Sequence, residues 1–136
     1  GASALLERLR RAIDGHLGDP GLGADWLMRR HGLSRARLYR LFEPLGGVAE
    51  HIRRRRLARA FVDLADPAAR DTRIATVARR WGFASEATFS RSFRARFGVS
   101  PSEVRGGGPR APTSALTDDG ARERLLDRWM RELGGR

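Results

Sequence analysis

The chain has 136 residues, 40% hydrophobic content and a formal net charge of +11, and all 27 of its basic residues are arginine. This length holds one ordinary domain or two small subdomains, and no apolar run approaches the roughly 20 residues of a membrane-spanning helix. The lack of cysteine excludes disulfides, zinc–thiolate sites and thiol nucleophiles. Residues 1–105 hold 21 of the arginines against 11 acidic residues, and such a basic field favours nucleic acid or an anionic membrane as partner.

The first part of the chain is predicted to contain three helices. One apolar stripe at helical spacing comprises Leu5, Leu9, Ile13 and Leu17. This stripe predicts a helix over residues 4–17 that lies on a core. A short helix is expected at about residues 24–31, ending at Gly32. Ser34 is in position to cap a third helix that runs to about Glu43.

Residues 48–65 are expected to form one longer helix, which at 1.5 Å per residue spans roughly 25 Å. That length suits a spacer between elements that enter successive major-groove faces, about 34 Å apart. The run Arg53-Arg54-Arg55-Arg56 must fan around the helix axis, so some of these side chains are expected to reach phosphate and others to pair with acids such as Glu50. Asp66-Pro67 closes this helix, and Thr72 is expected to cap the next one.

Residues 72–105 carry the clearest pattern in the chain. The apolar positions of its two main helices are Ile74, Val77, Ala78 and Trp81, then Phe89, Phe93 and Phe97. Gly82 separates the two runs and Ser85 can cap the second, so two helices meet at a glycine turn, as in a helix-turn-helix. The run Ser100-Pro101-Ser102-Glu103 has the residues of a capping box and predicts a final short helix.

This segment repeats an earlier one. Leu27 to Ser34 resembles Val77 to Ser85, with one residue inserted in the later turn. Beyond the turn the offset is constant at 51 residues, which matches Leu38 with Phe89 and Phe42 with Phe93. The sequence therefore predicts an all-α fold with two helix-turn-helix subdomains, at about 4–47 and 72–105, joined by the long linker helix.

The two matched helices expose equivalent side chains. With the matched apolar positions inward, a rotation of 100° per residue turns Ala36 and Arg40 outward in the first, and Ala87 and Arg91 in the second. A small residue allows close approach to a groove floor, and arginine can fork onto guanine. The alternative is that all four are ordinary solvated surface positions.

The C-terminal part is expected to differ in character. Residues 106–117 are rich in glycine and proline and predict a flexible linker. Residues 118–134 predict an amphipathic helix with an apolar face of Leu125, Leu126, Trp129, Met130 and Leu133. This face is expected to dock on its own domain, and dimerisation or partner binding is the alternative.

The sequence offers little for an enzyme. His16, His31 and His51 lie on separate predicted helices without metal-ligand spacing, and Gly106-Gly107-Gly108 lacks the ending of a phosphate-binding loop. We therefore predict no catalytic residues, no metal and no cofactor. Two other functions stay open beside specific DNA binding: a nonspecific, basic architectural DNA-binding protein, or a protein-interaction module.

Residues 5–105 resemble the DNA-binding domain of the AraC/XylS family of bacterial transcription regulators. The similarity is most specific in three runs, at residues 81–85, 89–93 and 97–101, the last being Phe97-Gly98-Val99-Ser100-Pro101. It implies seven helices whose paired recognition helices enter adjacent major grooves of double-stranded DNA. It also implies contact with RNA polymerase and a separate effector-sensing domain that is not visible here, so we expect a C-terminal fragment. The lack of cysteine and of a secretory signal favours a cytoplasmic protein, and no membrane partner is expected.

Resemblance and exposure together give the predicted site. The predicted base-facing residues are Arg35, Ala36, Arg37, Tyr39 and Arg40 in the first subdomain, and Glu86, Ala87, Thr88, Ser90 and Arg91 in the second. The predicted phosphate contacts are Ser34, Arg53, Arg54, Ser85 and Arg94.

Overall fold

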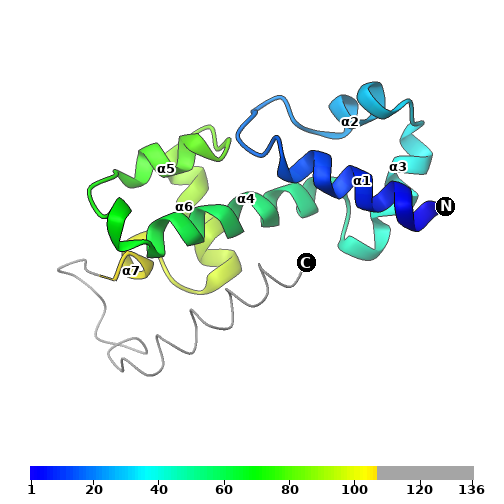
Figure 1. Cartoon of the computed structure of the whole chain (residues 1–136). Helices are drawn as coiled ribbons and strands as arrows, with labels where there is room; N and C mark the ends of the chain where they lie inside the picture. The colour runs from blue at the N-terminus through cyan, green and yellow to red at the C-terminus, as the bar shows by residue number, and fades with distance from the viewer. Residues whose placement is uncertain (107–136) are drawn as a thin grey trace.

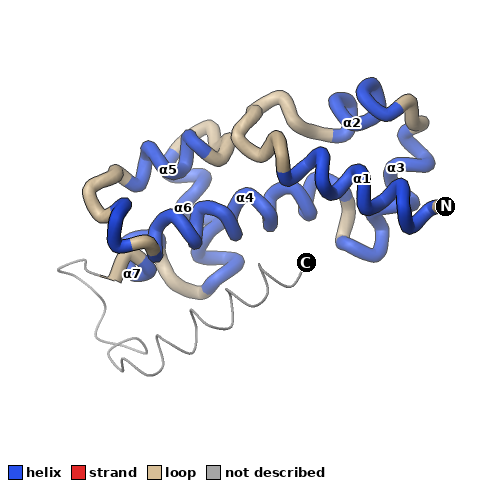
Figure 2. The backbone as a smooth tube through the Cα atoms, viewed as in Figure 1, coloured by secondary structure: helices blue, strands red, loops and turns tan. Residues whose placement is uncertain are grey.

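The computed structural model describes residues 1–106, in which every regular element is a helix (Figures 1 and 2). The elements are α1 (Ala2–Asp14), α2 (Ala24–His31), α3 (Arg35–Phe42), η1 (Glu43–Leu45), α4 (Val48–Ala65), η2 (Pro67–Ala69), α5 (Ile74–Arg80), α6 (Glu86–Phe97) and α7 (Pro101–Val104). The all-α prediction is thereby confirmed. The predicted linker at 106–117, apart from Gly106, and the predicted helix at 118–134 lie outside the described residues.

The linker helix α4 runs along the middle of the molecule, with α1, α2 and α3 at one end and α5, α6 and α7 towards the other (Figure 1). We call α1–α3 the first unit and α5–α7 the second unit. Each unit packs on its own part of α4, since Val48 and Ile52 join the first hydrophobic core and Leu57 and Phe61 the second. A single rigid helix therefore serves both cores.

The first core is built from the predicted stripe of α1 and the inner faces of α2 and α3. Its buried residues are Leu5, Leu9, Ile13, Leu17, Leu22, Leu27, Leu38, Phe42, Val48 and Ile52. Leu38 and Phe42 are both 0% exposed, as the repeat predicted. Burial of one such side chain stabilises the fold by about 1.5–3 kcal/mol before the loss of conformational entropy is counted.

The second core is aromatic. Phe89, Phe93 and Phe97 follow one another along α6, and Phe61 of α4 packs against them, with ring centroids 6.0 Å from Phe93 and 4.8 Å from Phe97. Phe89 and Phe93 are 0% exposed, like their counterparts Leu38 and Phe42. The helical stripe read from the sequence is thus the face that holds α6 against α4.

Two helices differ from the predictions at their ends. The first helix is Ala2–Asp14 instead of 4–17, because residues 15–17 continue as turns that still bring Leu17 into the core. Thr72 does not cap α5, whose N-cap is Arg73 without a side-chain hydrogen bond. The Thr72 carbonyl instead accepts a hydrogen bond from Arg105, which ties the start of α5 to the end of α7.

Candidate nucleic-acid interface

Both recognition helices begin at the serine that the sequence predicts. Oγ of Ser34 accepts a hydrogen bond from the backbone N–H of Arg37 at 3.1 Å, and Oγ of Ser85 accepts one from that of Thr88 at 3.1 Å. The preceding turns need a left-handed residue, which glycine supplies with φ of 64° at Gly32 and 84° at Gly82. Local capping and turn chemistry therefore define where α3 and α6 start.

On α3 the predicted base-facing residues Arg35, Ala36, Arg37, Tyr39 and Arg40 are all exposed. They are not equally available. Nη2 of Arg35 donates a hydrogen bond to the Asp25 carboxylate at 2.7 Å. Its Nη1 donates one to the Tyr39 hydroxyl at 3.1 Å. The hydrogen bond with Tyr39 has the largest effect and that with Asp25 the next largest, and both raise the pKa of the Arg35 guanidinium. Ala36, Arg37 and Arg40 take no part in this set of hydrogen bonds.

On α6 the corresponding residues Glu86, Ala87, Thr88 and Arg91 are exposed, whereas Ser90 is half-buried. Nη2 of Arg91 lies 3.5 Å from the Thr88 hydroxyl, which also accepts a hydrogen bond from Ser85 at 3.0 Å. Ala87 and Arg91 stand where Ala36 and Arg40 stand in the first unit. Ser90 is thus less accessible than the other four predicted residues of α6.

The predicted phosphate contacts differ in what they bind within the protein. Arg53 is half-exposed and pairs with Glu50, as the sequence suggested. Arg54 donates to the Leu45 carbonyl, and its Nη1 lies 3.5 Å from Glu50. Burial, with Arg96 and Arg53 nearby, lowers the pKa of Arg54. Arg94 is well exposed, with its Nη2 3.9 Å from the Glu103 carboxylate.

A polar cleft of about 440 Å³ lies along the contact between α4 and α6 and is lined by residues of both helices. Its charged lining is Arg53, Arg54, Arg91 and Arg96, with Glu50 as the acidic member. Four guanidinium groups near one carboxylate give this cleft a strongly positive field, which favours a polyanion. Arg96 was missed by the sequence analysis, because only the docking of α6 on α4 brings it close to Arg54.

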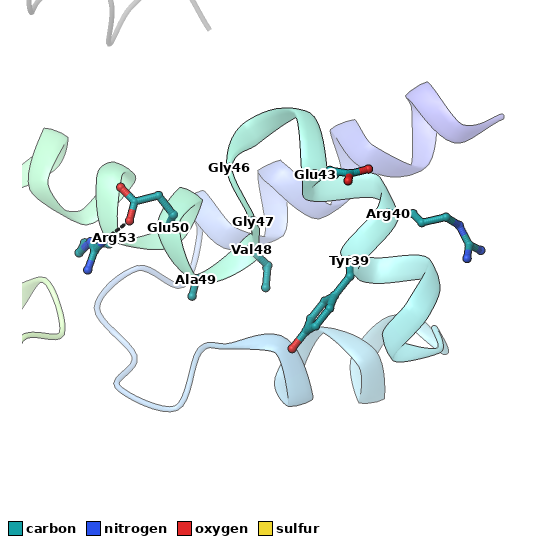
Figure 3. A pocket seen from close by; sticks show the side chains of 9 residues that line it. All are labelled: Tyr39, Arg40, Glu43, Gly46, Gly47, Val48, Ala49, Glu50 and Arg53. Carbon is teal, nitrogen blue, oxygen red and sulfur yellow. Dashed lines mark hydrogen bonds and ion pairs between the residues drawn. The ribbon is translucent and has the colours of Figure 1, made fainter.

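A second, more apolar groove of about 710 Å³ lies between α3 and the start of α4 (Figure 3). Tyr39 and Arg40 line its α3 side, and Gly47, Val48 and Ala49 line its α4 side. Glu50 and Arg53 line both this groove and the cleft. The exposed faces of both recognition helices therefore border one connected surface along α4.

Residues 1–106 contain no group of three or more histidine, cysteine or acidic side chains that could hold a metal ion. His51 is buried against Phe42, with ring centroids 5.5 Å apart, and His16 packs on Trp26 at 4.7 Å. Within the same residues, no helix combines the length and the apolar character that crossing a membrane requires.

Comparisons with known proteins point to one family. The family model described as a helix-turn-helix domain matches residues 27–107. The regulatory protein SoxS of Salmonella typhimurium is 34% identical over 103 residues, which cover 74% of this chain and 92% of SoxS. PqrA of Proteus vulgaris, a probable transcription factor, is 33% identical over 90 residues, covering 65% of this chain and 71% of PqrA.

Solved structures agree with the sequence comparison. A transcriptional regulator of the AraC-type from Chromobacterium violaceum superposes with a TM-score of 0.70 at 27% identity, over 82% of this chain and 98% of that one. The C-terminal domain of AraT from Geobacillus stearothermophilus shares the fold, with a TM-score of 0.68 at 24% identity over 83% and 90% of the two chains. This chain therefore belongs to the AraC-type helix-turn-helix family and is a sequence-specific DNA-binding regulator of transcription.

Proposed function

We propose that α3 and α6 read two successive major-groove segments of one asymmetric DNA site. The observation that carries this proposal is the matched pair of exposed side chains, Ala36 with Arg40 and Ala87 with Arg91. Of these, Arg40 lines the groove and Arg91 lines the cleft, and the groove and the cleft share Glu50 and Arg53 on α4. Two identical half-sites in a palindrome would suit a two-fold symmetric dimer. Two unlike helices in a single chain suit two unlike half-sites in tandem.

Specificity comes from the residues that differ between the two helices. Arg40 and Arg91 each suit guanine, because a guanidinium can donate to O6 and N7 together. Glu86, exposed at the start of α6, can accept from N4 of cytosine, and the first turn of α3 has Arg35 at the equivalent position. The half-site under α6 is therefore proposed to contain a cytosine that the half-site under α3 does not require.

The cleft between α4 and α6 is proposed to face the DNA backbone between the two grooves. Arg53 and Arg94 are exposed enough to reach phosphate, while Arg54 contributes charge from its place beside the Leu45 carbonyl. The N-terminal turns of α3 and α6, at Ser34 and Ser85, add backbone N–H groups at the positive ends of the helices. These contacts orient the protein without reading sequence.

Membership of the family supports a proposal about the cellular role. We propose that the chain acts on promoters in the bacterial cytoplasm, in contact with RNA polymerase, and without enzymatic activity of its own. The relative AarP of Providencia stuartii, described as a transcriptional activator, is 28% identical over 126 residues, which cover 91% of this chain. Activation is therefore the proposed sign of regulation.

Selection of bound duplexes from a random DNA pool tests the proposed reading mode. The parent should select two different half-sites about one helical turn apart. Arg40→Ala and Arg91→Ala should each weaken binding by about 1–3 kcal/mol and relax preference at separate base pairs. Arg29→Ala and Arg79→Ala are matched controls, because both residues are exposed and lie at equivalent places on α2 and α5.

The controls should leave the sequence preference unchanged. The tandem mode is wrong if Arg40→Ala and Arg91→Ala relax the same base pairs, or if neither changes the selected sequences. A parent that binds every sequence equally would indicate an architectural protein, and a parent that does not bind DNA at physiological salt would indicate an interaction module.

A further inference from the structure

The two units touch directly where the loop after α1 lies against the turn between α5 and α6. A Cβ added to Gly18 would lie 2.8 Å from the Arg80 carbonyl oxygen, and one added to Gly82 would lie 3.0 Å from the Leu17 carbonyl oxygen. Real Cβ atoms essentially never come within 3.0 Å of another heavy atom in this way. The two backbones are therefore in contact at a distance that glycine alone permits without a shift.

The side chain of Arg56, from the middle of α4, lies between these two backbones. Its Nε donates to the Leu17 carbonyl at 2.9 Å, and its Nη2 donates to the Asp19 carbonyl at 2.8 Å. Its Cζ is 2.9 Å from the position of a Cβ on Gly82. Burial lowers the pKa of this guanidinium, and the Asp19 carboxylate opposes that effect. One arginine thus joins the first unit, the linker helix and the turn that leads into α6.

The corresponding turn of the first unit has no such contact. Gly32 is left-handed like Gly82, with φ of 64° against 84°, yet a Cβ on Gly32 would meet nothing within 4 Å. A helix-turn-helix turn therefore needs glycine for its backbone conformation and does not by itself need a close neighbour. The contact at Gly82 is a feature of how the units meet.

Trp81 strengthens the same junction. Its indole packs against both hydrophobic cores, and its Nε1 donates to Asp63 of α4 at 2.8 Å. The residue before Gly82 is therefore fixed to α4 while Gly82 itself lies against the first unit. Because this turn sets the direction in which α6 leaves α5, the junction sets the placement of α6 relative to α3.

We propose that Arg56, Gly18 and Gly82 form an inter-unit clamp that fixes the separation and helical phase at which the two recognition helices meet DNA. Arg56 is then a positioning residue for the spacing between half-sites, although it reads no base. This consequence for DNA rests on the proposed tandem reading. One inserted base pair moves a half-site by about 3.4 Å and rotates it by about 35°, so a rigid pair of helices accepts one spacing.

Distances in the free protein test the clamp without DNA. The chain contains no cysteine, so Ala36→Cys and Ala87→Cys allow one spin label on each recognition helix. Pulsed dipolar spectroscopy should give one narrow distance distribution for the labelled parent. Arg56→Ala should broaden it, and Gly18→Ala should shift or broaden it, because the added methyl group separates the two backbones.

Matched controls separate the clamp from general destabilisation. Arg55→Ala removes the same charge one residue away, where Arg55 joins α4 to Asp14 of α1 at 2.9 Å. Gly15→Ala adds the same methyl group to the same loop, where it would meet only ordinary contacts of 3.5 Å and longer. Both controls should keep the narrow distribution, and thermal melting identifies any variant that is not folded.

Spacing tolerance of the unlabelled proteins gives the functional readout. Insertion or deletion of one base pair between the selected half-sites should weaken binding of the parent about tenfold or more, comparable with a lost base contact. Arg56→Ala should reduce that penalty to about threefold or less, with the same preferred bases in each half-site. Gly18→Ala should prefer a different spacing or accept several.

The outcomes distinguish the two proposals. Equal distance distributions in the parent, Arg56→Ala and Gly18→Ala would overturn the clamp, whatever the binding data show. An unchanged spacing penalty in both variants would overturn its role in DNA recognition. A parent that selects no paired half-sites contradicts the tandem reading instead, and the distance distributions then decide on the clamp alone.

Discussion

The indole Nε1 of Trp81 donates a hydrogen bond to Oδ2 of Asp63 at 2.8 Å, and the same oxygen lies 2.9 Å from Nη1 of Arg80. Trp81 is partly buried and contacts both hydrophobic cores, so the carboxylate of one α4 residue fixes the aromatic ring at the junction of the two units. The guanidinium of Arg59 lies over the same ring, with its Cζ 5.4 Å from the Trp81 ring centroid.

Asp63→Ala is therefore expected to destabilise the protein. The change removes the acceptor of the indole N–H and the partner of Arg80, at a cost of about 1–3 kcal/mol in the free energy of unfolding. Urea denaturation measures the difference. Asp71→Ala, which removes an exposed carboxylate, is the control and should change the free energy by less than about 0.5 kcal/mol. Equal effects of the two substitutions would contradict a specific role for Asp63.

Ser34→Asp separates helix capping from phosphate contact. Aspartate caps a helix about as well as serine, so the thermal stability should stay nearly unchanged. A carboxylate at this position repels a neighbouring phosphate, so the affinity for DNA should fall about tenfold, with like-charge repulsion as the cause. Ser85→Asp should behave in the same way on α6.

Ser100→Asp is the matched control for this pair, since Oγ of Ser100 caps α7 by accepting from the Glu103 N–H at 3.2 Å. Its DNA affinity should equal that of the parent in a fluorescence anisotropy titration. If Ser34→Asp binds DNA as tightly as the parent does, Ser34 does not face phosphate.

Glu50→Gln is expected to strengthen DNA binding. Glu50 pairs with Arg53 and Arg54 in the basic cleft, so its carboxylate competes with phosphate for the same guanidinium groups. A partly exposed pair of this kind is worth about 0.2–1 kcal/mol, which corresponds to a gain in affinity of about 1.4-fold to fivefold on its loss. Because phosphate contacts are not base-specific, the gain should be the same for all sequences.

A salt series on one fixed duplex checks this prediction. The parent should lose affinity with a log–log slope steeper than about −3, since each phosphate contact contributes about −0.9, and Glu50→Gln should be steeper still. Glu7→Gln on α1, where Glu7 lies 3.7 Å from Arg10, is the control with the same change in charge. If Glu50→Gln has no higher affinity for DNA than the parent at any salt concentration, phosphate binding in the cleft is contradicted.

His51 is expected to make the stability depend on pH. Burial lowers its pKa from 6.5 to about 4, with Arg10, Arg54 and Arg55 contributing and Asp14 opposing. Between these two values the unfolded chain binds a proton that the native protein does not, so the free energy of unfolding falls as the pH is lowered from 6.5 towards 4. The slope for one group is at most about 1.4 kcal/mol per pH unit.

Urea denaturation at pH 7 and pH 5 should show this loss, and His51→Leu should reduce it. Nε2 of His51 finds no hydrogen-bond partner among the described residues, so leucine removes the titration without breaking a hydrogen bond at that atom. Burial also lowers the pKa of His31, with Arg30 and Arg8 adding to it. His31 should therefore retain part of the pH dependence in the single variant, and an unchanged pH dependence would contradict the role of His51.

The helical order of the chain was open to prediction because its causes are local. The inward stripes at Leu38 and Phe89, the serine caps of both recognition helices and the left-handed glycines depend on neighbours within a few residues. The internal repeat then showed that both units use the same plan. Even here the end of the first helix was misplaced, since a turn can keep the apolar period of a helix, as residues 15–17 do around Leu17.

The partners of the four arginines from Arg53 to Arg56 could be predicted from the sequence only in part. Helical geometry requires them to fan out, and the first of them pairs with Glu50 as expected. Arg54 also pairs with Glu50, and the remaining partners of the other three are the Leu45 carbonyl, the Asp14 carboxylate and the carbonyls of Leu17 and Asp19. These choices depend on segments about nine to forty residues away, so only the docking of the first unit on α4 could decide them.

The basic cleft has the same origin, because Arg54 and Arg96 lie on separate helices that share no local pattern. The sequence alone determined which residues face inward on α3 and α6 and where those two helices start. The tertiary structure alone decided how the two reading helices are placed relative to each other, because packing between distant segments, at Arg56 and Gly82, has no signature in local periodicity or capping.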